Sequence, residues 1–184
     1  MKTKDICFTK ENSWFRYRTG AFILKDDKML FVKSKFGGYF YMIGGGVSLG
    51  ETSVDCIERE ILEETGIHAK VERLAVVTEN FFKGENGILE GLDCHTIEFY
   101  YLVKVIDASN VFSKTDDGEE LVWIPIEEIK ISFFKPSFIP EKIDEIINGK
   151  NILHIIEERD RWFLGDYKMK DVYEFCPQFE NEKY

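Results

Sequence analysis

Residues 44–67 read GGGVSLGETSVDCIEREILEETGI, and this stretch decides how the rest of the chain is interpreted. Thr52 or Ser53 can cap the N-terminus of a helix, and the acids that follow complement the helix dipole. Gly66 stands where a glycine commonly ends a helix. We therefore expect a helix between the triple glycine and Gly66.

This helix should have an apolar side that faces a sheet. The apolar side carries Val54, Ile57 and Ile61. Beside it, Glu60, Glu63 and Glu64 are spaced i, i+3 and i+4, and they fall within an arc of about 100°. Like charges at this spacing destabilise a helix by about 0.2–0.5 kcal/mol per pair, and a bound divalent cation would reverse the sign. Carboxylates are hard oxygen ligands, so the row favours Mg²⁺ or Mn²⁺.

Two features around the helix fit a ligand site. Gly44, Gly45 and Gly46 let the backbone approach a ligand closely, and a carbonyl in this run could be a neutral metal ligand. Arg59 lies among the acids and could pair with Glu51, which would hold the loop against the helix.

Taken together, these residues resemble the Nudix box. That signature is a glycine, five residues, a glutamate, seven residues and then Arg-Glu-aliphatic-any-Glu-Glu-any-Gly-aliphatic. Here it is matched by Gly45, by Glu51 and by REILEETGI over residues 59–67. The family often has proline before the double glycine, where this chain has Ile43. The order of strands around the box also resembles the family over about residues 15–131.

The resemblance implies a role for each matched residue. Glu63 and Glu64 would be the principal metal ligands, and Glu60 would be a further ligand or the base that activates water. A carbonyl of Gly44 or Gly45 would add another ligand. The reaction would be attack of water on a phosphorus of a diphosphate, with Mg²⁺ or Mn²⁺ neutralising the developing charge.

Arg59 and Glu51 would hold the loop and helix in register. Some family members use a further acid from a later loop. The preferred candidates here are Glu119 and Glu120, just before the strand-like LVW run. The weaker candidates are Glu79 and Glu85.

The remaining pattern predicts an α/β protein. Strands are expected at 17–24, 28–33, 40–43, 69–79, 95–106, 121–126 and 152–156, and a second helix at 141–148. The resemblance implies a Nudix-type α/β/α sandwich with a mixed central sheet. We interpret residues 1–184 as a single domain with its core at about 15–131 and a C-terminal extension at 132–184.

Composition excludes several classes of protein. Hydrophobic residues make up 44% and charged residues 32%, which is typical of a soluble globular chain. The formal net charge of −10 argues against non-specific nucleic-acid binding and against an anionic membrane surface. The four cysteines form no CxxC pair, and no apolar run approaches the length of a membrane span. We expect a cytoplasmic protein with reduced thiols.

The expected function is therefore hydrolysis of a nucleoside diphosphate linked to a further group. Sugar nucleotides such as ADP-ribose and modified nucleoside triphosphates are the expected substrates, and loops at 81–95 and 113–120 together with the C-terminal third would select among them. The alternative is a catalytically silent Nudix domain that senses a nucleotide. RNA cap removal would need a basic channel, which the net charge disfavours. The resemblance also implies a homodimer. We interpret Phe133, Phe134 and the aromatic tail as a dimer contact or a lid rather than a cofactor box.

Overall fold

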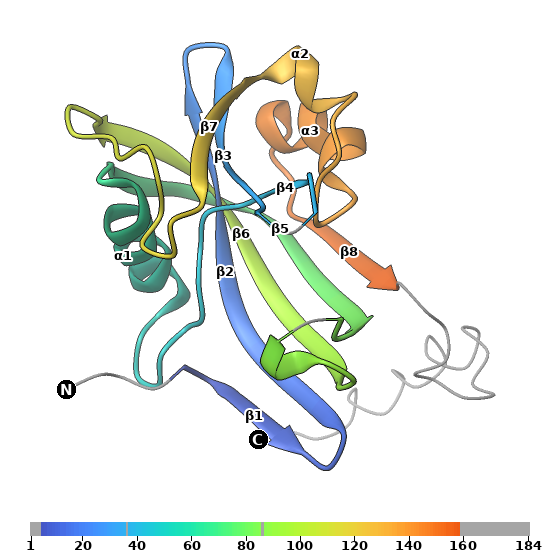
Figure 1. The fold of residues 1–184 in the computed structure, drawn as a ribbon. Coiled ribbons are helices and arrows are strands. Elements are labelled where there is room, and N and C mark those ends of the chain that lie inside the picture. Colours follow the sequence, from blue (N-terminus) through green and yellow to red (C-terminus); the bar gives the residue numbers. More distant parts are fainter. Residues whose placement is uncertain (1–4, 36, 86, 159–184) are drawn as a thin grey trace, which may run out of the picture.

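The computed structural model describes residues 5–35, 37–85 and 87–158 (Figure 1). The strands are β1 (Cys7–Lys10), β2 (Ser13–Lys25), β3 (Lys28–Lys33), β4 (Phe40–Tyr41), β5 (His68–Lys83), β6 (Asp93–Asp107), β7 (Glu120–Pro125) and β8 (Leu153–Glu158). The helices are α1 (Ser53–Thr65), α2 (Ile126–Ile129) and α3 (Ile139–Asn148), with a 3-10 turn η1 at Gly87–Leu89. The predicted α/β class is therefore confirmed.

Within the described residues, eight strands form one mixed sheet. Its main order is β4-β3-β2-β6-β5-β8, while β1 pairs with β2 and β7 pairs with β3. The predicted hairpin is present, because β2 and β3 run antiparallel with Leu24 opposite Met29. The pairs β2–β6 and β5–β8 are parallel, and β5–β6 is antiparallel.

The helices cover opposite faces of this sheet (Figure 1). Side chains alternate along β2, so that Phe22 joins one buried cluster with Ile143 of α3. Ala21 points to the other face and joins a second cluster with Ile57 of α1. The two clusters confirm the α/β/α arrangement. Among the described residues, no helix is both long and apolar enough to cross a membrane.

Helix α1 begins and ends where its caps predict. The Thr52 hydroxyl accepts a hydrogen bond from the backbone N–H of Asp55, and Gly66 adopts a left-handed conformation with φ of 72°. Ile57 and Ile61 are fully buried, as expected. Val54 is an exception: it is 38% exposed, so the prediction that it faces the sheet is wrong. It lies in the first turn of α1.

Other differences come from long-range pairing. Strand β2 begins at Ser13 rather than at Tyr17, because its first four residues pair with both β1 and β6. Phe134 is 1% exposed and packs against Phe31 with ring centroids 4.6 Å apart, so it is a core residue of this chain and no dimer contact or lid. Phe133 is 59% exposed. The aromatic tail lies outside the described residues.

Candidate metal and nucleotide site

The glycine run is fixed along β2 by backbone hydrogen bonds. The Gly45 carbonyl accepts from the N–H of Thr19 at 2.9 Å, and the Ile43 carbonyl accepts from Ala21 at 3.0 Å. Gly45 also lies against α1, since a Cβ at this position would overlap the carboxylate of Glu60. Gly45 therefore lets the loop and the carboxylate row come together, and its carbonyl keeps a second lone pair.

Arg59 of α1 is hydrogen-bonded to three glutamates, one in the preceding loop and two on the helix. Its guanidinium donates to both oxygens of Glu51, with Nε–Oε1 at 2.8 Å and Nη2–Oε2 at 3.1 Å. This pairing confirms the predicted link between loop and helix. Nη1 additionally donates to Glu60 at 2.7 Å and to Glu63 at 2.9 Å. The hydrogen bonds from Arg59 hold the pKa of Glu51 below its ordinary value.

The carboxylates of the row differ in environment. Glu63 is 54% exposed, whereas the side chain of Glu60 is only 15% exposed, and burial raises the pKa of Glu60. Burial together with the charge of Glu60 raises the pKa of Glu64 to about 7, although the backbone N–H of Gly44 and the charge of Arg18 oppose the shift. Glu64 is therefore the acid whose charge is least stabilised by its protein surroundings.

A divalent ion fits this donor set after a small rearrangement. Across residues 5–35, 37–85 and 87–158, no three His, Cys, Asp or Glu side chains converge on one metal position. The reason is visible in the contacts, since Glu60 and Glu63 are turned toward Arg59. Rotation of these two side chains away from Arg59 would free their carboxylate oxygens, which are hard donors of the kind that bind divalent ions.

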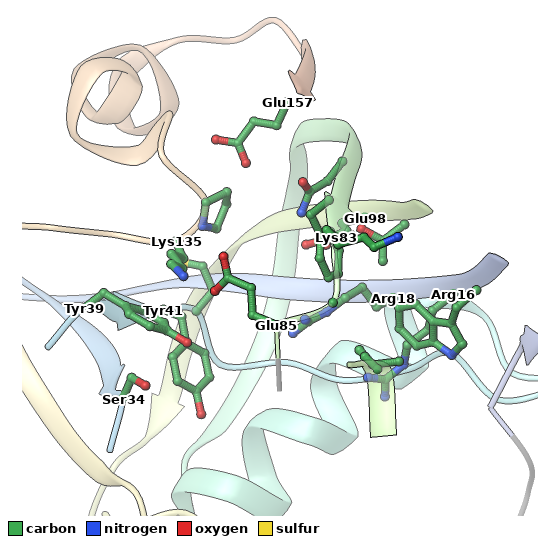
Figure 2. Close-up of a pocket in the computed structure, with 18 of the residues that line it drawn as sticks. Arg16, Arg18, Ser34, Tyr39, Tyr41, Lys83, Glu85, Glu98, Lys135 and Glu157 are labelled. Carbon is green, nitrogen blue, oxygen red and sulfur yellow. Dashed lines mark hydrogen bonds between the residues drawn. The ribbon is translucent and has the colours of Figure 1, made fainter. Parts of the chain in front are cut away.

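A pocket of about 450 Å³ is lined by Arg18, whose charge interacts with Glu64 of the carboxylate row (Figure 2). Its floor is the sheet face formed by Arg16 and Arg18 of β2 and by Glu98 of β6. Arg18 joins the pocket to the helix, because its charge interacts with Glu98 and Glu64. Burial lowers the pKa of Arg18, but these negative neighbours outweigh that effect and raise it. Tyr41 lines the same pocket and also interacts with Glu64.

The structure separates the candidates for a further acid. Glu119 lines the pocket, where it accepts hydrogen bonds from the Tyr41 hydroxyl and from the N–H of Lys35 at 3.1 Å. Glu120 is 60% exposed and pairs with Lys33 at 3.5 Å. Glu85 also lines the pocket, whereas Glu79 pairs with His154 at 2.9 Å. Of the two preferred acids, only Glu119 lines the pocket.

Several pocket residues were absent from the sequence-based site. Arg16 and Arg18 alternate along β2, which indicates one polar face, but the pattern does not show what that face meets. Glu98 stands in an otherwise apolar run in β6, and a lone charge in a buried strand was a usable signal. Trp14 and Tyr39 also line the pocket, and they carried no local signal.

Comparison with known families agrees with this geometry. The sequence model of the NUDIX domain family matches residues 14–142, so the chain belongs to this family. An ADP-ribose pyrophosphatase of Methanocaldococcus jannaschii is 32% identical over 115 residues. That alignment covers 60% of this chain and 63% of the relative, so the chain spans less than two thirds of the relative's length.

Solved structures show the same fold at low identity. A NUDIX hydrolase from Nitrosomonas europaea superposes with a TM-score of 0.59 at 18% identity, covering 82% of this chain and 81% of that one. A MutT protein from Bacillus halodurans gives 0.58 at 18%, covering 76% and 86%. An ADP-ribose pyrophosphatase from Streptococcus suis gives 0.52 at 15%, covering 77% and 98%.

Proposed function

We propose that this protein is a divalent-metal-dependent pyrophosphohydrolase that cleaves the diphosphate linkage of a nucleoside diphosphate derivative. The observation that carries the proposal is the position of Glu64. It joins the carboxylate row of α1 to the pocket through Arg18, so a diphosphate bound by Arg18 would lie next to the metal ligands.

Each residue of the site has a separate task in this proposal. Glu63 and Glu64 would hold Mg²⁺ or Mn²⁺ together with Glu60 or the Gly45 carbonyl, and the bound ion would neutralise charge that develops on the phosphates. Arg18 binds the diphosphate, since a guanidinium matches phosphate geometry. Arg59 keeps the loop against α1 through Glu51.

Glu119 is the candidate for the base that removes a proton from the attacking water. The Tyr41 hydroxyl and the Lys35 N–H orient its carboxylate from two sides, one hydrogen bond to each oxygen. Glu60 is the second candidate for this task, because it is largely shielded from solvent beside Glu64. Substituting Glu119 and Glu60 one at a time tests which of them removes the proton.

ADP-ribose is the first substrate to test. The M. jannaschii relative, 32% identical over 115 residues, carries the name ADP-ribose pyrophosphatase. The pocket volume of about 450 Å³ lies within the range of small-molecule sites. A homodimer and a cytoplasmic location stay predictions.

The test measures release of phosphate-containing products from ADP-ribose, other sugar nucleotides and nucleoside triphosphates. It is run with Mg²⁺, with Mn²⁺ and with chelator. We expect metal-dependent turnover of one class, with Glu64→Gln and Glu63→Gln lowering kcat by at least about 100-fold. Glu120→Gln is the matched control, because Glu120 points away to Lys33. Full turnover in chelator would contradict the proposal.

A second candidate is a nucleotide sensor without turnover. The observation that favours it is the contact of Arg59 with both Glu60 and Glu63, which pairs these two acids within the protein itself. Nucleotide binding without hydrolysis across the whole substrate panel would support this candidate.

A further inference from the structure

The most unusual residue in the pocket is Glu98. Its carboxylate lines the pocket floor, yet the residue is only 4% exposed. Over residues 5–35, 37–85 and 87–158, no ion pair within 4 Å holds it, although the charge of Arg18 acts on it from the neighbouring strand. A carboxylate removed from water costs several kcal/mol unless it is well bonded.

The surroundings fix the position of this carboxylate. The Thr96 hydroxyl donates to Oε1 at 2.7 Å, and the Tyr100 hydroxyl donates to Oε2. Tyr100 reaches this position because Gly20 leaves room for its ring, which a Cβ at residue 20 would overlap. Each oxygen of Glu98 thus has one hydroxyl donor and a remaining acceptor site. The carboxylate is preorganised as an acceptor.

Glu98 belongs to a row of residues paired across β2, β6 and β5, and the described residues do not satisfy all hydrogen-bonding groups of this row. Arg18 lies opposite Glu98 on β2, and Thr78 lies opposite it on β5. Both neighbours bury a polar atom that has no hydrogen-bond partner among the described residues, namely Arg18 Nε and Thr78 Oγ1. Buried polar networks kept for stability alone are usually fully satisfied. Because Arg18 also lines the pocket, a ligand bound there could supply the partner that its Nε lacks.

We infer that Glu98 is a specificity-determining residue that accepts hydrogen bonds from a pair of uncharged donors on the nucleoside part of the substrate. This inference rests on the proposed function. A carboxylate repels phosphate, so Glu98 must face a neutral group while Arg18, one strand away, faces the diphosphate. Because an ionised carboxylate can only accept hydrogen bonds, Glu98 cannot recognise a base edge that carries acceptors alone.

Two nucleoside groups offer such a donor pair. One is the vicinal diol of ribose, and the other is the ring N–H with the adjacent amino group of guanine. Each can donate two parallel hydrogen bonds to a carboxylate, and a good bidentate pair discriminates by about 5- to 150-fold. Two pairs of mononucleotides separate the sources: AMP with 2′-deoxy-AMP for the diol, and GMP with IMP for the amino group.

The experiment measures dissociation constants of these four mononucleotides by calorimetry in chelator, where no turnover occurs. For the wild-type protein we expect at least about a fivefold preference within one pair. In Glu98→Gln this preference falls toward unity, because an amide offers only one acceptor. Glu79→Gln is the matched control, since Glu79 lies on neighbouring β5 on the opposite face and should keep the preference.

Thr96→Val provides a second variant that retains the carboxylate but removes one of the donors that orient it. It should reduce the same preference by a smaller factor. A merely structural role for Glu98 would weaken all four ligands equally and leave both ratios unchanged, which would overturn the inference. Absence of any preference in the wild-type protein would also overturn it. Discrimination by the wild-type protein without hydrolysis of any diphosphate would refute the proposed function and leave the inference intact.

Discussion

The substitution Glu64→Gln should stabilise the protein when no metal is present. Burial and the neighbouring charge of Glu60 raise the pKa of Glu64 from 4.5 to about 7. At pH 8 the folded protein therefore carries a negative charge on Glu64 that its surroundings destabilise. Glutamine has the same shape without the charge, and its oxygen can still accept from the Gly44 N–H. Such a gain is expected where an active site gives up stability for function.

The magnitude follows from the difference between the two pKa values. The pKa of Glu64 rises by about 2.5, from 4.5 to about 7. At about 1.36 kcal/mol per pH unit, this shift limits the stability gained by the variant to about 3 kcal/mol. Partial solvent access lowers this, and we expect about 1–2 kcal/mol at pH 8. Because the folded pKa is the higher one, the wild-type free energy of unfolding falls as pH rises from 4.5 through about 7. The advantage of the variant should therefore shrink toward about pH 4.5.

Urea unfolding followed by tryptophan fluorescence in chelator, at about pH 5 and about pH 8, measures this difference. A variant less stable than the wild type at the higher pH, or a difference that does not change with pH, would refute the reasoning. Added Mg²⁺ supplies a second check. It should stabilise the wild type by about 2.7 kcal/mol at a concentration 100 times Kd, and the variant by much less, so the order of stability reverses.

Three further predictions test the site. Gly45→Ala should lower kcat by at least about 10-fold while unfolding stays cooperative, because its Cβ would displace the Glu60 carboxylate; equal activity would contradict the packing at the loop. Arg59→Ala should lower the free energy of unfolding by about 1–2 kcal/mol in chelator, measured with urea, since Glu51 loses both hydrogen bonds. Glu119→Gln should lower kcat by about 100-fold or more in the hydrolysis assay, and Glu120→Gln should change it less than about twofold.

The sequence was sufficient where the information is local. Helix α1 begins and ends at its predicted caps, because Thr52 and Gly66 act on backbone groups within the same few residues. The pairing of Arg59 with Glu51 was also predictable, since both belong to one motif of fixed spacing. The partner of Glu60 was less predictable, because a guanidinium with five donors can bind several acids at once.

The pocket could not be predicted in the same way. Arg18 and Glu98 are 80 positions apart in the chain, and they become neighbours only through the parallel register of β2 and β6. A shift of that register by one residue would turn Glu98 to the opposite face. The choice between Glu119 and Glu120 also depends on residues far away in the chain, because Glu119 bonds to Tyr41 whereas Glu120 pairs with Lys33.

Arg59 explains how the chain tolerates three acids at helical spacing before any cation is bound. Its guanidinium contacts Glu60 and Glu63 as well as Glu51, so it offsets repulsion that would otherwise destabilise α1. Binding of a divalent ion would take over that task for Glu60 and Glu63 and leave Arg59 with Glu51 alone. The loop would then keep its place while the acids change partners. Glu64 makes no contact with Arg59 among the hydrogen bonds of the described residues, and its raised pKa marks it as the acid that gains most from the ion.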